Sequence, residues 1–413
     1  MASTGEDLSR SLAERRAPTA TIDVKRMRHE RYARLQAEMA RQSVDVALLL
    51  HAPNVAYATG QPVRGIDVSH AVFERPVAVV VAGEDRAHLL ADAVDPGLDV
   101  EGHPAVWPEL DEGAARLARA LADVAGPLAG RRVAVDEQSG AMLRAGVLDG
   151  LDGVAVVDAA QLIGAAKLTK TGDELACIAE AQRRNEQAMV AAQDVARPGA
   201  TRSEVAGAFL AALARLGVEA NLIDPIFQPM PRSAAEGPRT SAKTIAFPTG
   251  AGNPTFAEGD LVWVDSGIDH LGYASDFGRT WVIGRRPNPA EARLFERWCQ
   301  VMVAALQALA PGATAGDLCR AAESVGGNGE RPWLPHFYLA HGVGVESAEM
   351  PLVGTDLGAQ FDDRLVMAPG MVLVFEPVIW EDGVGGYRAE EIVAVTEDGW
   401  CHLGGGHPYP PFV

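Results

Sequence analysis

The sequence has few cysteines, and they lie far apart. Four of its 413 residues are cysteines, and no two form a Cys-x-x-Cys pair: Cys177, Cys299, Cys319 and Cys401. This spacing argues against a disulfide framework and against a thiolate zinc site, and it is typical of a protein kept in a reducing compartment. We therefore expect a cytoplasmic protein.

Basic residues are also scarce. The chain has 36 Lys and Arg against 55 Asp and Glu, which gives a formal net charge of −19. A chain without a broad basic field does not attract a phosphate backbone, so we expect no nucleic-acid partner. Most of the acidic excess favours solubility, and a minority of the carboxylates remains available to surround a cation.

Long hydrophobic runs are absent as well. Residues 1–20 are polar and lack the apolar centre of a cleavable signal peptide. The longest uncharged stretch, residues 298–316, is interrupted by Gln300, Gln307 and Pro311, which is typical of a helix followed by a turn. We expect neither a membrane span nor a membrane partner.

The length predicts two or three domains, and 48% hydrophobic with 22% charged residues is a globular composition. We interpret residues 1–22 as a flexible arm. Residues 23–163 alternate helical and strand patterns, which predicts an α/β domain. Residues 164–413 begin with a capping box at Thr171–Glu174 and two helices, and continue with short apolar strands, which predicts an α+β domain.

The second domain contains five residues whose pattern indicates metal chemistry. Asp265 ends an apolar run, Asp276 follows 11 residues later, and a glycine-containing turn between them would bring the two carboxylates together. Burying an unpaired carboxylate is costly, so a lone Glu in an apolar strand requires a cation or a hydrogen-bond partner. Four carboxylates and one imidazole suit two divalent ions of Mn, Fe, Co or Zn: Asp265, Asp276, His341, Glu376 and Glu390.

The motifs around these residues resemble those of the pita-bread metallopeptidases, which include methionine aminopeptidase, aminopeptidase P and prolidase. The resemblance rests on the segments DSG, YASDFGRT, HGVGVESAEMP, FEP and GGYRAEEIVAVTEDG. The segment PNVAYATG resembles the creatinase-type N-terminal domain that accompanies the peptidase domain in prolidases. The resemblance therefore implies a creatinase-like α/β N-terminal domain followed by an α+β pita-bread catalytic domain.

The resemblance also implies the chemistry. It places the five residues at the family's metal-ligand positions, with Asp276 and Glu390 where both ions are bridged. It implies a dinuclear metal-dependent hydrolase that cleaves a C–N bond of a dipeptide-like or other small substrate with a metal-bridging hydroxide. Glu376 would orient the water or accept its proton, and Arg388 would support the ligands. Relatives with this build imply a homodimer.

The sequence departs from the peptidase pattern at two histidines that lie near the substrate. The segment 245–265 contains no histidine, and Ala348 stands where the second one is expected. An alanine can neither donate to a carbonyl nor shuttle a proton. Similar losses occur in dimethylsulfoniopropionate lyases of this fold, which makes metal-dependent β-elimination the alternative function.

Three further residues are candidates for catalysis under that alternative: Glu346, Glu349 and His336. The lyases carry their base as an Asp in the segment after HGVG, and this chain has no Asp there. For the two glutamates, an ion pair or a solvated loop position is the simpler interpretation. For His336, packing beside aromatic residues competes with substrate contact. A non-catalytic binding module is the third alternative, and the intact set of five ligand-type residues argues against it.

Overall fold

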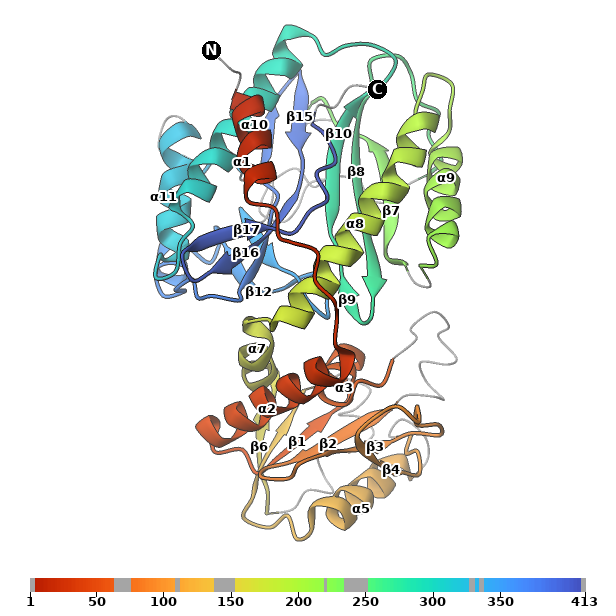
Figure 1. Cartoon of the computed structure of the whole chain (residues 1–413), viewed down its shortest axis with the longest axis vertical. Helices are drawn as coiled ribbons and strands as arrows, with labels where there is room; N and C mark the ends of the chain where they lie inside the picture. The colour runs from red at the N-terminus through yellow and green to blue at the C-terminus, as the bar shows by residue number, and fades with distance from the viewer. Residues whose placement is uncertain are drawn as a thin grey trace. The chain divides into compact units, whose positions relative to one another are not determined.

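The computed structural model describes residues 4–62, 76–107, 112–136, 153–218, 221–233, 252–326, 331–333 and 338–409. The chain forms two compact units (Figure 1). The first comprises Asp23–Lys167, and the second comprises Met1–Ile22 together with Leu168–Val413. Among the described residues, no helix is both long enough and apolar enough to cross a membrane.

The first unit is built on one mixed sheet of six strands in the order β4-β3-β2-β1-β5-β6. Its buried side chains are mostly Val and Leu, which suit the pleated interior of a sheet. Its elements are α2 (Val24–Gln42), β1 (Val46–Leu49), α3 (Ala52–Thr59), β2 (Val77–Val81), β3 (Ala87–Leu90), β4 (Val100–His103), α5 (Gly113–Ala125), β5 (Arg132–Val135), β6 (Ala155–Asp158) and α7 (Ala160–Leu168).

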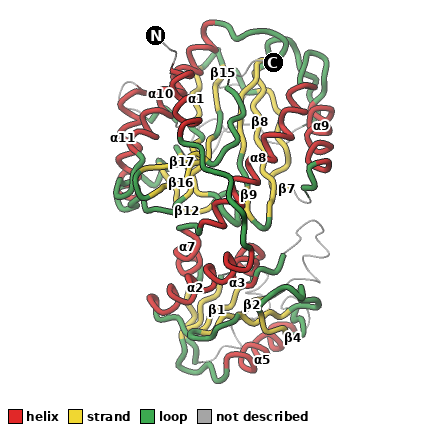
Figure 2. Tube along the Cα trace, in the orientation of Figure 1, coloured by secondary structure: helices red, strands yellow, loops and turns green. Residues whose placement is uncertain are grey.

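The second unit combines three sheets with helices (Figure 2). Its helices are α1 (Thr4–Glu14), α8 (Gly172–Val195), α9 (Arg202–Arg215), α10 (Pro289–Ala308), α11 (Ala315–Gly326) and α12 (Ala359–Asp362). Its strands are β7 (Asn221–Pro229), β8 (Leu261–His270), β9 (Tyr273–Ala274), β10 (Phe277–Val282), β11 (Ala340–Gly342), β12 (Glu349–Val353), β13 (Val372–Phe375), β14 (Val378–Glu381), β15 (Gly385–Arg388), β16 (Glu391–Thr396) and β17 (Gly399–His402).

Two sheets of this unit carry the residues of interest. The order β10-β8-β7, with β9 on β8, forms the first sheet, which packs against α8 and α9. The order β12-β11-β13-β16-β17 forms the second, whose core includes side chains of α10 and α11. The predicted capping box at Thr171 and Glu174 is present and begins α8.

The expectation of a flexible arm at the N-terminus is wrong for its described part. Residues Thr4–Glu14 form helix α1, and Leu8 and Leu12 belong to the buried core around α10. Gly5 lies against Phe295, where a Cβ would come within 3.0 Å of the ring. Two leucines four residues apart share one face of a helix, and burying that face holds the segment in the second unit.

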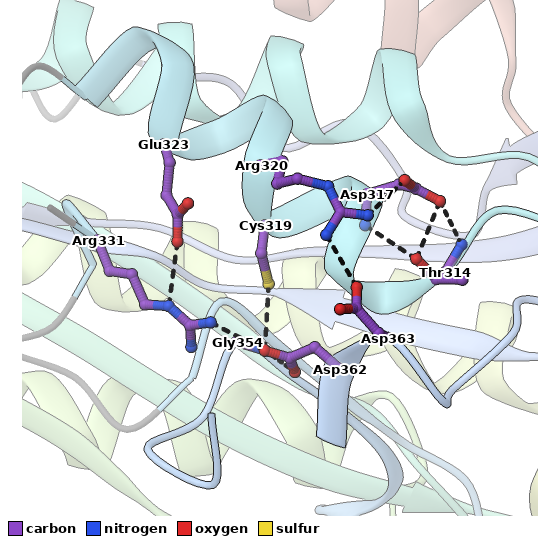
Figure 3. A network of polar contacts seen from close by, with 9 residues as sticks. All are labelled: Thr314, Asp317, Cys319, Arg320, Glu323, Arg331, Gly354, Asp362 and Asp363. Carbon is purple, nitrogen blue, oxygen red and sulfur yellow. Dashed lines mark hydrogen bonds and ion pairs between the residues drawn. The ribbon is translucent and has the colours of Figure 1, made fainter. Parts of the chain in front are cut away.

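A polar network fixes the end of β12 to α11 and α12 (Figure 3). The carboxylate of Asp362 is fully buried and accepts hydrogen bonds from the Gly354 amide at 2.9 Å and the Arg331 guanidinium at 3.0 Å. Arg331 also donates to Glu323 at 3.1 Å. A buried carboxylate with these donors is satisfied, so this network anchors the sheet that carries β11.

Candidate metal centre

The first two predicted ligands lie on a β-hairpin. Strands β8 and β10 pair antiparallel, with Gly278 opposite Asp265 and Phe277 opposite Ser266. The chain reverses at Leu271 and Gly272, both of which have positive φ (55° and 84°). Asp276 immediately precedes β10, so the local turn brings it beside Asp265, as the sequence predicted.

The other three predicted ligands lie on the neighbouring sheet. His341 is in β11 and pairs with Val374 of β13. Glu376 follows β13 directly, and Glu390 precedes β16, whose first residue pairs with Phe375. Antiparallel pairing therefore gathers three residues that are up to 49 positions apart in the sequence.

The hairpin and the sheet meet at Gly278. The amide of Glu390 donates to the Gly278 carbonyl at 3.0 Å, and a Cβ at Gly278 would lie 2.5 Å from the Glu390 carboxylate carbon. Arg279 joins the same two elements, because its guanidinium donates to the Glu390 carbonyl and to the Glu391 carboxylate, each at 2.8 Å. The close approach of the Glu390 carboxylate to residue 278 requires a glycine there, because any Cβ would collide with it.

All five side chains converge. Carboxylate oxygens of Asp265, Asp276 and Glu390 lie within 4.8 Å of one another. The Nε2 atom of His341 is 3.3 Å from Asp276 Oδ2 and 2.9 Å from Glu376 Oε1. Four of the five residues have side chains at most 7% exposed, and Asp265 is the most accessible at 13%.

Burial dominates the electrostatics of this cluster of carboxylates. Burial raises the pKa of Asp265 to about 7; Arg388 opposes the rise, and neighbouring carboxylates add to it. Burial likewise raises the pKa of Glu390 well above its ordinary value. Burial disfavours the charged form of His341, but hydrogen bonds to Asp276 and Glu376 raise its pKa to about 10. The cluster therefore favours added positive charge.

Two observations indicate that the residues of this cluster fit divalent cations. Asp265 Oδ1 and Glu390 Oε2 are buried and accept no hydrogen bond from the described residues. Such orphaned oxygens are costly unless a cation or another donor satisfies them. The donor set is carboxylate oxygens with one imidazole, which suits Mn, Fe, Co or Zn.

Arg388 lies inside this cluster. Its Nη1 is 3.1 Å from Asp265 Oδ2, its Nε donates to Glu376 Oε2 at 3.1 Å, and its Nη2 forms ion pairs with Glu376 and Glu390. The guanidinium also lies over the ring of Trp263, 5.1 Å from the centroid. One arginine thus contacts three of the four predicted carboxylate ligands and holds them in orientation.

The remaining predicted candidates make other contacts or lie outside the described residues. Glu349 forms a buried ion pair with Lys170, with 2.6 Å between Oε1 and Nζ, and both side chains are at most 5% exposed. A carboxylate held in this way is a structural partner of Lys170. Glu346 is half-buried in the loop after β11, where its carbonyl accepts from the Gly344 amide at 3.1 Å. His336 lies outside the described residues.

One supporting residue escaped the sequence reasoning. Asn185 of α8 is fully buried and donates to the Ser266 carbonyl at 2.8 Å and to Ser275 Oγ at 3.0 Å. These two serines immediately adjoin Asp265 and Asp276. The signal was an amide on the apolar face of α8, between Ala181 and Ala188, because a polar residue on a buried face requires specific partners.

Comparison with known proteins places this geometry in a family. The model of metallopeptidase family M24 matches residues 176–397, and that of the creatinase/prolidase N-terminal domain matches residues 31–169. The first match spans more than half of the chain. The chain therefore belongs to metallopeptidase family M24.

Individual relatives agree with this assignment. The Xaa-Pro dipeptidase of Pyrococcus furiosus is 32% identical over 234 residues, which cover 56% of this chain and 62% of that protein. The corresponding protein of Pyrococcus horikoshii is 31% identical over 236 residues, covering 56% of this chain and 61% of that protein. The chain thus matches less than two thirds of the length of these curated relatives.

Solved structures share the fold over almost the whole chain. Dipeptidase PepE from Mycobacterium ulcerans has a TM-score of 0.72 at 22% identity and covers 95% of this chain and 99% of its own. The prolidase from Pyrococcus furiosus has a TM-score of 0.68 at 22% identity, covering 91% and 99%. The expected architecture, a creatinase-type N-terminal domain followed by a pita-bread domain, is confirmed.

Proposed function

We propose that this protein is a dinuclear metal-dependent hydrolase that cleaves the C–N bond of a small, dipeptide-like substrate. The observation that carries the proposal is the convergence of Asp265, Asp276 and Glu390, buried together within 4.8 Å with orphaned oxygens. The similarity to proteins named Xaa-Pro dipeptidases supports the reaction class.

Five side chains would hold the two ions: Asp265, Asp276, His341, Glu376 and Glu390. When bound, two divalent ions supply a water of lowered pKa and polarise the carbonyl oxygen that is attacked. His341 is oriented for this role because its Nδ1 lies 2.8 Å from the Gly342 carbonyl, which leaves Nε2 facing the carboxylates.

The other side chains of the centre would orient the metal ligands and accept or donate the protons of the reaction. Arg388 donates hydrogen bonds to both Glu376 and Asp265 and so holds the two carboxylates in orientation. Glu376 would accept the proton of the attacking water. Its Oε1 lies 2.9 Å from His341 Nε2, on the side of the centre, while its Oε2 accepts a hydrogen bond from Arg388. Because Ala348 has no proton to donate, the leaving amine would take its proton from the substrate or from solvent.

The test begins with the metal content of the purified full-length chain. We expect at least two ions per chain by elemental analysis after reloading separately with Mn²⁺, Fe²⁺, Co²⁺ or Zn²⁺. Each loaded form is then assayed with Xaa-Pro dipeptides, betaines and sulfonium acids, with mass spectrometry of the products. Amine release by hydrolysis supports the proposal. An alkene product would instead establish the lyase, and absence of bound metal would favour a binding module.

We further propose that the active form is a cytoplasmic homodimer that uses manganese. The support is the set of four dispersed cysteines, all free thiols, the oxygen-rich ligand set and the resemblance to two-domain prolidases. Light scattering of the purified chain gives the oligomeric state. Ranking the four metals by turnover tests manganese, and a monomer or a higher turnover with another ion would overturn the respective part.

A further inference from the structure

A second cluster of ligand-type side chains lies in the first unit, on strands β3 and β4. It consists of His88, Glu101 and His103, each of which offers one ligand atom within 4.8 Å of the others. It contains no residue of the proposed catalytic centre, and the inference drawn from it is independent of the proposed function.

The strand register places the three side chains on one face. Strands β3 and β4 pair in parallel, with His88 opposite Glu101 and Leu90 opposite His103. Because side chains alternate along a strand, residues 101 and 103 point to the same side, where His88 meets them. Strand β4 is the last in the order of this sheet (Figure 1), so the cluster is accessible from its edge.

The separations between ligand atoms suit a tetrahedral ion. His88 Nδ1 is 3.0 Å from His103 Nε2 and 3.7 Å from Glu101 Oε2. Ligands at the usual zinc distances of about 2.0–2.2 Å stand roughly 3.4 Å apart when the geometry is tetrahedral. The two separations from His88 lie on either side of that value, and the third, between Glu101 and His103, is at most 4.8 Å. A rotation of the exposed Glu101 side chain would bring its carboxylate to the spacing of a tetrahedral site.

A fourth residue, Glu84, sets which ring nitrogen of His88 carries the proton. Its Nε2 lies 2.7 Å from the Glu84 carboxylate, and an ionised carboxylate only accepts hydrogen bonds. The ring proton of His88 is therefore on Nε2, and the lone pair of Nδ1 accepts a hydrogen bond from His103 Nε2 at 3.0 Å. Binding of an ion would displace the proton from His103 Nε2, which would free both nitrogens to face the ion. A carboxylate behind a ligating histidine is the usual outer support of a metal site, which fixes the tautomer and raises ligand basicity.

We propose that His88 Nδ1, His103 Nε2 and Glu101 bind Zn²⁺ as a second metal site, with solvent at the fourth position. Two imidazoles and one carboxylate are a ligand set that zinc accepts with an open position. The Glu101 side chain is 63% exposed, whereas that of His88 is 8% exposed, so one side of the site is fixed and the other is open to the ion. Bound zinc would join the edge strand β4 to β3 and stabilise this unit by mass action.

The test measures zinc stoichiometry in the full-length protein. Wild type, His103→Ala and His29→Ala are dialysed against Zn²⁺ buffered by a competing chelator. His29 is an exposed histidine of α2 in the same unit and serves as the matched control. We expect His103→Ala to hold one zinc equivalent fewer than the other two proteins and to keep the wild-type hydrolytic activity. Equal zinc content in all three would overturn the proposal.

A graded variant and a direct location complete the test. Glu84→Gln should leave the site present but weaken its zinc affinity 10- to 100-fold, the usual effect of losing an outer carboxylate. Anomalous scattering at the zinc edge, from crystals grown with Zn²⁺, should give a peak between the three side chains. Peaks elsewhere with none at this position, or unchanged zinc affinity in Glu84→Gln, would contradict the assignment.

Discussion

The chain carries two clusters of metal-ligand side chains that are built in different ways. The acidic centre of Asp265, Asp276 and Glu390 is buried and crowded with like charge. The histidine cluster of His88, Glu101 and His103 sits at a sheet edge, with one buried and two more accessible members. The first has orphaned oxygens, whereas the second is hydrogen-bonded through Glu84 even without an ion.

This difference teaches which cluster depends on a cation. Buried like charges cost folding free energy until a cation or a shared proton neutralises them. The histidine cluster contains a single carboxylate, Glu101, whose side chain is 63% exposed. It therefore carries no comparable cost and is compatible with both the loaded and the metal-free state. We therefore expect the acidic centre to be coupled to stability and activity, and the histidine cluster to contribute more weakly.

The largest expected effect comes from Glu390→Gln. The change keeps the shape of a fully buried side chain but removes the charge that faces the proposed ions. Activity should fall by more than about 100-fold, which exceeds the usual loss for a residue that only supports a ligand. The bound metal should fall while the zinc of the histidine cluster remains. Elemental analysis and steady-state rates measure both quantities.

The matched control for that variant is Glu397→Gln, the same change at an exposed position just beyond the other end of β16. It should leave metal content and rate unchanged. The same number of bound ions in Glu390→Gln as in the wild type would remove this residue from the ligand set.

Arg388→Ala should produce the next largest effect, on stability. Removing one partner of a buried ion pair costs about 3–5 kcal/mol because the other charge is left uncompensated. We expect the metal-free variant to unfold at a lower urea concentration than the wild type. Added Mn²⁺ should increase the free energy of unfolding of the variant by more than it increases that of the wild type. Arg320→Ala, which removes two exposed ion pairs, should change little. Equal stabilisation by metal in Arg388→Ala and wild type would show that this arginine does not offset the acidic charge.

Asn185→Ala tests how the α8 helix supports the acidic centre. It leaves the Ser266 carbonyl and the Ser275 hydroxyl without their buried donor, which costs about 1–3 kcal/mol. Metal affinity should also weaken, because both serines adjoin predicted ligands. Denaturant unfolding and metal titration measure the two effects against Gln187→Ala, an exposed amide of the same helix. A loss of stability with unchanged metal affinity would limit Asn185 to a packing role.

The smallest effect, a gain, is expected from Ala348→His. It places an imidazole at the position where the resemblance to the peptidases predicts one, and a well-placed proton donor supports cleavage of a peptide bond. Hydrolysis of an Xaa-Pro dipeptide should rise by at least about tenfold. Ser347→His, which places the same ring one residue earlier, should give no comparable gain. No increase in Ala348→His would count against an ordinary dipeptide as the substrate.

The sequence predicted the parts of the fold that depend on short-range patterns. The capping box at Thr171, the helices α8 to α11 and the β8–β10 hairpin each follow from residues within one or two elements. Helix α1 was missed because a short amphipathic segment near a terminus is helical only once Leu8 and Leu12 find the core around α10. An ion pair was one of the expected interpretations of Glu349, but its partner Lys170 was not identified because the two residues are separated by 179 positions.

By itself, the sequence determined which side chains this protein has available for metal chemistry and, through turn and strand patterns, that Asp265 and Asp276 lie side by side. Only the tertiary structure decided that Arg388 contacts three of the carboxylates and offsets part of their charge, that Glu349 is paired with Lys170, and that His88 meets His103. The physical reason is the distance along the chain between the residues that interact. Turns and caps are set by neighbouring residues, whereas the partner of a buried charge is set by which distant elements pack together.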